Sequence, residues 1–220
     1  MSQGISSKLA VAWRALAIAG GLMAAGCGGV SAPIMTGGAP FALSADLKDQ
    51  VGIRYVWAET TPEALGSHVV MRDPDHDWSQ RDWQERDQAR GSLDWELTTD
   101  VANEVRQELK ECAAGGRTVD AAIRIERIVY DGVDSDATGR DEMVALVELF
   151  EADGSGPIAR YRITGVSPRR FSSEPPYDME GFSITLNDRE DSMAEYLGRE
   201  LCLQAFGRNP RPSRIFNMTN

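Results

Sequence analysis

The chain has few of the residues that build metal centres and nucleophilic active sites. Two of its 220 residues are histidine and three are cysteine. His68 and His76 fit neither an H-x-H nor an H-E-x-x-H spacing, and we expect both on the surface. The chain also lacks a G-x-S-x-G serine elbow and a phosphate-binding glycine loop. These absences favour a non-enzymatic protein without a metal or a cofactor.

Two aspartate-rich stretches approach calcium loops, but each lacks an essential residue. Residues 134–139 supply the D-x-D-x-T-G opening of such a loop, yet its twelfth position, which needs a bidentate carboxylate, is Ala145. Residues 73–79 have alternating aspartates, but Trp78 stands where the sharp turn needs glycine. We expect both stretches to be polar loops.

Basic residues are scarce relative to acidic ones. The chain has 23 Lys and Arg against 34 Asp and Glu, a formal charge of −11, and its densest basic cluster is the short stretch 168–170. Bulk electrostatics therefore oppose binding to nucleic acid or to anionic lipid, and we expect no nucleic-acid partner.

Long hydrophobic runs are absent as well. The best candidate is residues 15–26, an uncharged run of about 18 Å if helical, while a bilayer core is about 30 Å thick. No acidic residue precedes Cys27, and Lys8 and Arg14 supply a positive start. A charged start, a short apolar run and small residues at its end are typical of a signal peptide.

The sequence L-M-A-A-G-C that ends at Cys27 resembles the lipobox of bacterial lipoproteins, in which the cysteine is acylated, for instance with palmitate, and becomes the mature N-terminus. It departs from that pattern at Ala24, where the family usually has leucine. The resemblance implies a lipid anchor at Cys27. Gly28 after the cysteine, by resemblance to Gram-negative sorting patterns, implies the outer membrane, facing the periplasm. The alternative is an ordinary signal peptide with an incidental cysteine.

The expected organisation has four parts. Residues 1–26 are a signal peptide, and their removal shifts the formal charge from −11 to −13. Residues 27–50 are the lipidated N-terminus and a flexible Gly-, Ala-, Ser- and Pro-containing tether. Residues 51–207 form one periplasmic domain, and residues 208–220 form a mobile tail.

Anchoring Cys27 leaves two other cysteines, Cys112 and Cys202, each near the end of a predicted helix. A disulfide between them would close a long loop and stabilise the fold. The alternative is two buried free thiols that pack as small apolar side chains.

Within the domain, periodicity predicts a strand at residues 51–59, and the polar stretch over 71–97 is expected to be irregular or weakly helical. A helix follows from 99–100 to the glycines at 115–116, and then come strands over 119–131, 143–151 and 158–166. A short strand within 181–186 and a helix from 188 to 207 complete the order. This order predicts a single α+β, two-layer domain with a mixed, mostly antiparallel sheet and two main helices on one face.

The hairpin of residues 119–132 with 143–165 is similar to one in ABC-type transport auxiliary lipoproteins and in envelope lipoproteins whose domain resembles the N-terminal domain of TolB. That resemblance implies an accessory or assembly component of an envelope or transport complex, with an envelope protein as partner.

Three tryptophans lie among charged residues in the stretch of uncertain structure: Trp78, Trp83 and Trp95. They form either a surface that binds glycan, peptidoglycan or a partner, or anchors that hold a long connection to the core.

Overall fold

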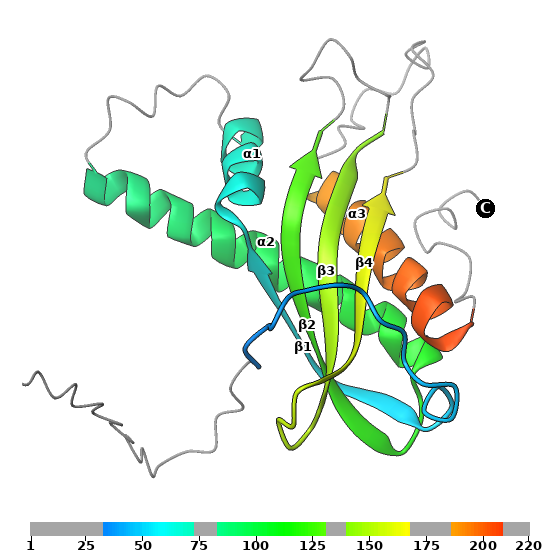
Figure 1. Ribbon diagram of the computed structural model, residues 1–220. Helices are drawn as coiled ribbons and strands as arrows, with labels where there is room; N and C mark the ends of the chain where they lie inside the picture. The colour runs from blue at the N-terminus through cyan, green and yellow to red at the C-terminus, as the bar shows by residue number, and fades with distance from the viewer. Residues whose placement is uncertain (1–32, 73–82, 131–139, 168–185, 209–220) are drawn as a thin grey trace, which may run out of the picture. The chain divides into compact units, whose positions relative to one another are not determined.

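The fold is known from a computed structural model, which describes residues 33–72, 83–130, 140–167 and 186–208, without the side chains of 72, 83, 85, 86 and 186–188. The described part has four strands and three helices in the order β1-α1-α2-β2-β3-β4-α3, followed by a final π-helical turn, η1 (Figure 1). Their bounds are β1 Val51–Thr60, α1 Pro62–Arg72, α2 Trp83–Cys112, β2 Arg117–Val129, β3 Glu142–Glu151, β4 Pro157–Val166, α3 Leu186–Leu201 and η1 Cys202–Phe206.

The strands form one mixed sheet in the order β1-β2-β3-β4. β1 runs parallel to β2, whereas the β2–β3 and β3–β4 pairs are antiparallel. The parallel pair follows from the connection, since α1 and α2 carry the chain back before β2 begins. The predicted fold class, a single α+β domain with a mixed and mostly antiparallel sheet, is confirmed.

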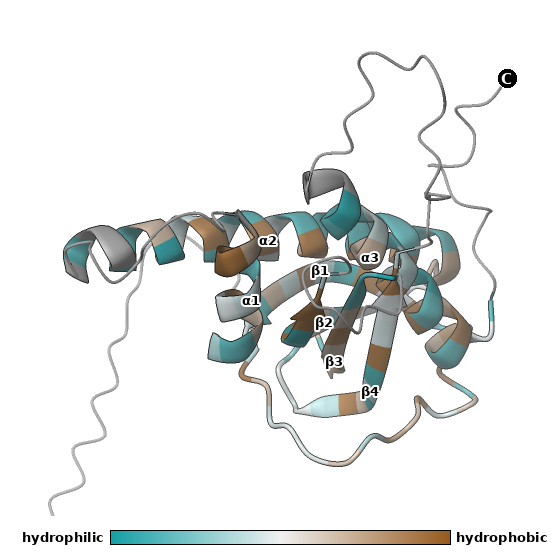
Figure 2. Ribbon diagram, turned by 90° about the horizontal axis from the view of Figure 1, so that it is seen from above, coloured by the Kyte–Doolittle hydropathy of each residue, from teal (hydrophilic) through white to brown (hydrophobic). Residues whose placement is uncertain are grey.

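One face of the sheet, here called the inner face, packs against α2 and α3 (Figure 2). The predicted apolar stripes supply this core: Val101, Val105 and Leu109 from α2 are buried, as are Met193 and Leu197 from α3. Gly165 on β4 permits the close approach of α3, because a Cβ there would lie 2.1 Å from the carbonyl oxygen of Met193.

Residues 71–97, expected to be irregular or weakly helical, are helical wherever the structure describes them. α1 follows β1, and α2 begins at Trp83 rather than near Asp100. Thr98 lies inside the helix, where its hydroxyl donates to the carbonyl oxygen of Asp94. The first half of α2 is rich in good helix formers but has no core-facing stripe, so hydrophobic periodicity did not reveal it.

Residues 33–50 also differ from the expected flexible tether. Leu43 is 2% exposed within the main core, and Met35 is buried in a second cluster on the outer face of the sheet, opposite the helices. The short strand expected within 181–186 falls outside the described residues, except that Leu186 begins α3.

The C-terminal side of the domain is tied to α2. Cys112 and Cys202 form a disulfide with their Cα atoms 5.8 Å apart, the first of the two arrangements considered for them. The chain ends its last turn at Gly207, whose φ is 66°. Arg208, expected to begin a mobile tail, donates to the carbonyl oxygen of Cys112 and to Asp49. Among the described residues, no helix is both long and apolar enough to cross a bilayer.

Candidate functional site

Residues 33–43, which we call the strap, cross the outer face of the sheet from β1 toward β4 (Figure 1). Met35 packs there against apolar side chains of β2 and β3: Ala122, Leu146 and Phe150. The strap therefore gives the outer face a small core of its own.

A buried ion pair fastens the strap to the sheet. Glu148 and Arg160 are directly paired on β3 and β4, and the Nε of Arg160 lies 2.6 Å from Oε1 of Glu148. The Glu148 carboxylate is fully buried and also accepts from the backbone N–H and the hydroxyl of Thr36 and from the N–H of Gly37. Arg160 donates in turn to the Thr36 hydroxyl and to the Ala39 carbonyl oxygen.

The glycines of the strap are required where it passes over Arg160. Gly37 and Gly38 have φ values of 65° and 109°, in the region that favours glycine. A Cβ on Gly38 would also lie 2.9 Å from Nη1 of Arg160. The strap can follow this path only with glycine at both positions.

Beyond the glycines, the strap joins the edge of the sheet. Phe41 and Arg160 exchange two backbone hydrogen bonds of 2.9 and 2.8 Å, and the guanidinium of Arg160 lies over the Phe41 ring. The N–H of Leu43 then donates to the hydroxyl of Tyr161. Burial raises the pKa of Tyr161, and the hydrogen bond from Leu43 opposes that shift.

The Glu148–Arg160 pair directs its hydrogen bonds to groups of the fold itself. Both oxygens of Glu148 accept hydrogen bonds, and all three nitrogens of the Arg160 guanidinium donate. This charged pair thus joins the strap to β3 and β4. It fixes the path of the strap.

A second polar cluster corrects the prediction for His68. This histidine is fully buried between α1, β2 and α3, not on the surface. Its Nδ1 lies 2.8 Å from Oε1 of Glu190, which also accepts from the Tyr130 hydroxyl at 2.6 Å. Arg189 pairs with Asp141 next to them. These contacts join α1, the end of β2, the start of β3 and the start of α3.

Within the described part of the chain, the Nε2 of His68 has no hydrogen-bond partner, yet the side chain is 0% exposed. His76 lies outside the described residues. No group of three or more His, Cys, Asp or Glu residues in the described ranges could hold a metal ion. The calcium-like stretches lie almost entirely outside those ranges, and Ala145 lies in β3 as predicted.

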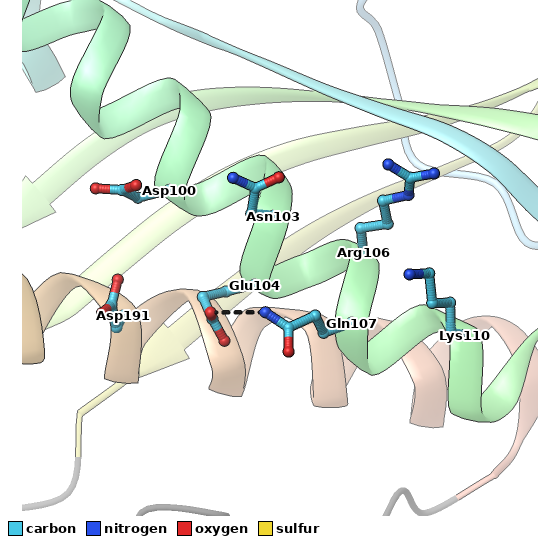
Figure 3. A pocket seen from close by; sticks show the side chains of 7 residues that line it. All are labelled: Asp100, Asn103, Glu104, Arg106, Gln107, Lys110 and Asp191. Atoms are coloured by element: carbon cyan, nitrogen blue, oxygen red, sulfur yellow. Dashed lines mark hydrogen bonds between the residues drawn. The ribbon is translucent and has the colours of Figure 1, made fainter.

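The described residues also form two surface grooves. The first, of about 430 Å³, follows α2 beside α3 (Figure 3). Its carboxylates lie toward one end and its cations toward the other, and Gln107 donates to Glu104. Its lining is Asp100, Asn103, Glu104, Arg106, Gln107, Lys110 and Asp191.

The second groove, of about 500 Å³, lies between α1 and the end of β2. Its walls include Val70, Met71 and Ile128, with Glu63 and Arg127 as charged residues. Val70 is half exposed. The walls of this groove hold several apolar side chains, whereas the lining of the first groove is entirely polar or charged, so the second groove is the more apolar of the two.

The structure brings together few of the predicted site residues. Cys27 and Trp78 lie outside the described residues. Trp83 begins α2, and Trp95 lies on the same helix about 18 Å further along its axis. Trp95 is 69% exposed, so it does not anchor a connection to the core.

The Glu148–Arg160 pair was not predicted, although the sequence held a signal for it. A turn at Asp153-Gly154 joins β3 to β4, with a φ of 79° at Gly154. Glu148 and Arg160 lie six residues before and after that glycine, and opposite charges across a hairpin favour pairing. The approach of the strap had no comparable signal.

Comparison with known proteins adds little. No protein-family model matches the chain, and no curated protein matches it. Among solved structures, it is similar to the PelC dodecamer from Paraburkholderia phytofirmans, with 14% sequence identity over 76% of this chain and 96% of that one. The TM-score of 0.30 is too low to establish a common fold or a common function.

Proposed function

We propose that this protein is a lipid-anchored, non-enzymatic accessory component of the cell envelope. Acyl chains on Cys27 hold it in the outer membrane, and its domain faces the periplasm. The observation that carries the proposal is the short distance in sequence between the lipobox cysteine at position 27 and the first residues that pack on the sheet, at positions 33–36.

That distance limits how far the domain extends from the bilayer. Five residues lie between Cys27 and residue 33, so the six steps from one to the other reach about 20 Å when fully extended. A flexible tether through residue 50 would reach about 80 Å. The domain therefore acts next to the membrane surface that holds its lipid.

The disulfide supports an exported location. Bridged cysteines form and persist in oxidising compartments such as the bacterial periplasm and are rare in the cytosol. Cys112 and Cys202 are bridged, which leaves Cys27 as the single cysteine available for acylation.

The first half of α2 supports the binding of an envelope protein. In Figure 1, these turns extend past α1 and away from the sheet. Leu97 is the first buried residue among the described side chains of this helix. Trp95, at the boundary, is largely exposed, and tryptophan is enriched among the residues that dominate binding energy.

Photo-crosslinking in cells tests this proposal. A photoreactive phenylalanine analogue replaces Trp95 in the anchored protein, and the same analogue replaces exposed Leu203 on η1 as the matched control. We expect a discrete crosslinked product from position 95, none from position 203, and its loss in a Cys27→Ala background. Equal crosslinking at both positions, or none at 95, would contradict the proposal.

A second candidate function, binding of glycan or peptidoglycan, is favoured by the same exposed tryptophan. An indole face that is open to solvent can stack on a sugar ring. Titration of the purified protein with peptidoglycan fragments, followed by tryptophan fluorescence, should show a saturable change that Trp95→Ala abolishes. An unchanged signal in both proteins would exclude this candidate.

A further inference from the structure

The strap differs in character from the rest of this acidic chain. From Gly28 to Ala45 the sequence contains no charged residue, although 26% of the whole chain is charged. Ile34 is 89% exposed and Phe41 is 41% exposed, and both are among the most exposed large apolar residues in the described part. Water-facing apolar side chains on an uncharged segment indicate an interaction surface.

Two aromatic residues of β1 lie beside the start of the strap. Trp57 is directly paired with Ala122, one of the side chains that Met35 covers. The rings of Tyr55 and Trp57 are 5.6 Å apart, and both side chains are partly exposed. Met35 therefore places the start of the strap beside an aromatic pair of the kind found at membrane–water interfaces.

Arginine side chains surround this apolar area on the outer face. In three ion pairs the guanidinium is more exposed than its acidic partner, with side-chain exposures of 35% against 8%, 52% against 33% and 63% against 30%. These pairs are Arg54–Asp120, Arg127–Glu142 and Arg162–Glu126. In a fourth pair on this face, Arg124–Glu59, the carboxylate is the more exposed group, at 53% against 32%. Three of these four pairs therefore direct the cation outward, although the chain as a whole has a formal charge of −11.

The position of the anchor identifies what this face contacts. The chain between Cys27 and Ile34 spans at most about 25 Å, and it ends on this face. With the lipid of Cys27 in a bilayer, the strap is the described part of the domain closest in sequence to that bilayer. Exposed apolar side chains, interfacial aromatics and outward guanidinium groups match the acyl, interfacial and phosphate regions of a phospholipid surface.

We propose that the strap and the outer face of the sheet form a membrane-docking surface, on which the domain lies against the phospholipid bilayer that holds its anchor. This inference rests on the proposed lipid anchor at Cys27. Docking leaves α2, on the opposite face of the sheet, directed away from the bilayer and free for a protein partner. The whole-chain charge opposes adsorption, so docking depends on the local composition of this face and on the anchor.

The test uses the full, membrane-extracted protein carrying an Ile34→Cys substitution labelled with a bimane fluorophore. Ile34 is almost fully exposed, so the substitution leaves the packing intact, and the disulfide and the acylated Cys27 leave position 34 as the one reactive thiol. The protein is reconstituted into vesicles of phosphatidylethanolamine and phosphatidylglycerol, with or without lipid that carries a spin label near the headgroup. Trp95→Cys, labelled in the same way, is the matched control on the helical face.

We expect the spin-labelled lipid to quench the fluorophore at position 34 at least twofold more than at position 95. Equal quenching at both positions in a protein whose mass shows acylated Cys27 would overturn the docking surface and leave the proposed function standing. An unacylated Cys27 would instead contradict the proposed function itself. A fluorophore at position 34 that is shielded from both lipid and aqueous iodide would indicate a protein on this face and would also overturn the inference.

Discussion

Glu148 connects the strap to the sheet more extensively than any other described side chain on the outer face. Its carboxylate is fully buried, yet four hydrogen-bond donors surround it, three of them from the strap. Removing one partner of a buried ion pair is costly because the other charge stays desolvated. These hydrogen bonds explain why β3, the most apolar strand, carries a charged residue at a buried position.

We predict that Glu148→Gln lowers the free energy of unfolding by about 3–5 kcal/mol, because Arg160 loses its counter-charge in a buried position. Urea denaturation of both proteins measures the difference. Glu142→Gln on the same strand is the control, since its partner Arg127 is 3.7 Å away and half exposed, and it should cost less than about 1 kcal/mol. Equal losses for the two variants would contradict the role given to Glu148.

Because of Tyr161, we expect the stability of the strap to fall as the pH becomes alkaline. Its pKa is raised, chiefly by burial, so the folded protein keeps the phenolic proton at a pH where the unfolded chain has lost it. The contribution is therefore complete below about pH 10, the ordinary value for tyrosine, and is lost as the pH rises through the folded pKa.

We expect the wild type to lose more stability between pH 9 and pH 11 than Tyr161→Phe, which has no proton to lose. Thermal unfolding of both proteins at the two pH values gives the comparison, and it cancels the contributions of the other tyrosines. Parallel pH profiles would show that Tyr161 is not the residue responsible.

Among the helices and strands, those whose apolar residues recur at a regular spacing could be predicted from the sequence. β1, β2, β3 and β4 were found because their inner faces are regularly apolar, and α3 because its stripe recurs at helical spacing. The start of α2 was left between irregular and weakly helical because Leu97 is the first buried residue among its described side chains, so the turns before it lack a core-facing stripe. The strap was missed because a Gly- and Pro-containing segment held by long-range hydrogen bonds resembles a linker in composition.

The disulfide joins the end of α2 to the turn after α3 across 90 residues of sequence. In the chain-entropy model, closing a loop of this length stabilises the fold by about 4–5 kcal/mol. We expect reduction to lower the urea midpoint of the wild type and to leave the midpoint of a Cys112→Ser, Cys202→Ser double variant unchanged. An unchanged midpoint for the wild type would contradict a stabilising bridge.

For the whole molecule, the short segment between Cys27 and residue 33 changes what the acidic surface implies for contact with a membrane. An unanchored domain with this charge would stay away from anionic membranes, yet only five residues stand between Cys27 and residue 33, where the described domain begins. With the proposed lipid on Cys27, the domain would have one face near the bilayer and a helix directed outward. Such an arrangement suits a protein that positions a partner at the membrane, and the sequence supported only its first half, the anchor.

The anchor is the claim on which the rest of the account depends, and the mass of the mature N-terminal peptide tests it most directly. The protein is extracted from the membranes of its own host and digested, and the peptide that contains Cys27 is analysed by mass spectrometry. We predict a peptide that begins at Cys27 and carries the mass of a diacylglycerol and an amide-linked acyl chain. A peptide with unmodified Cys27, or cleavage at another residue, would contradict the account.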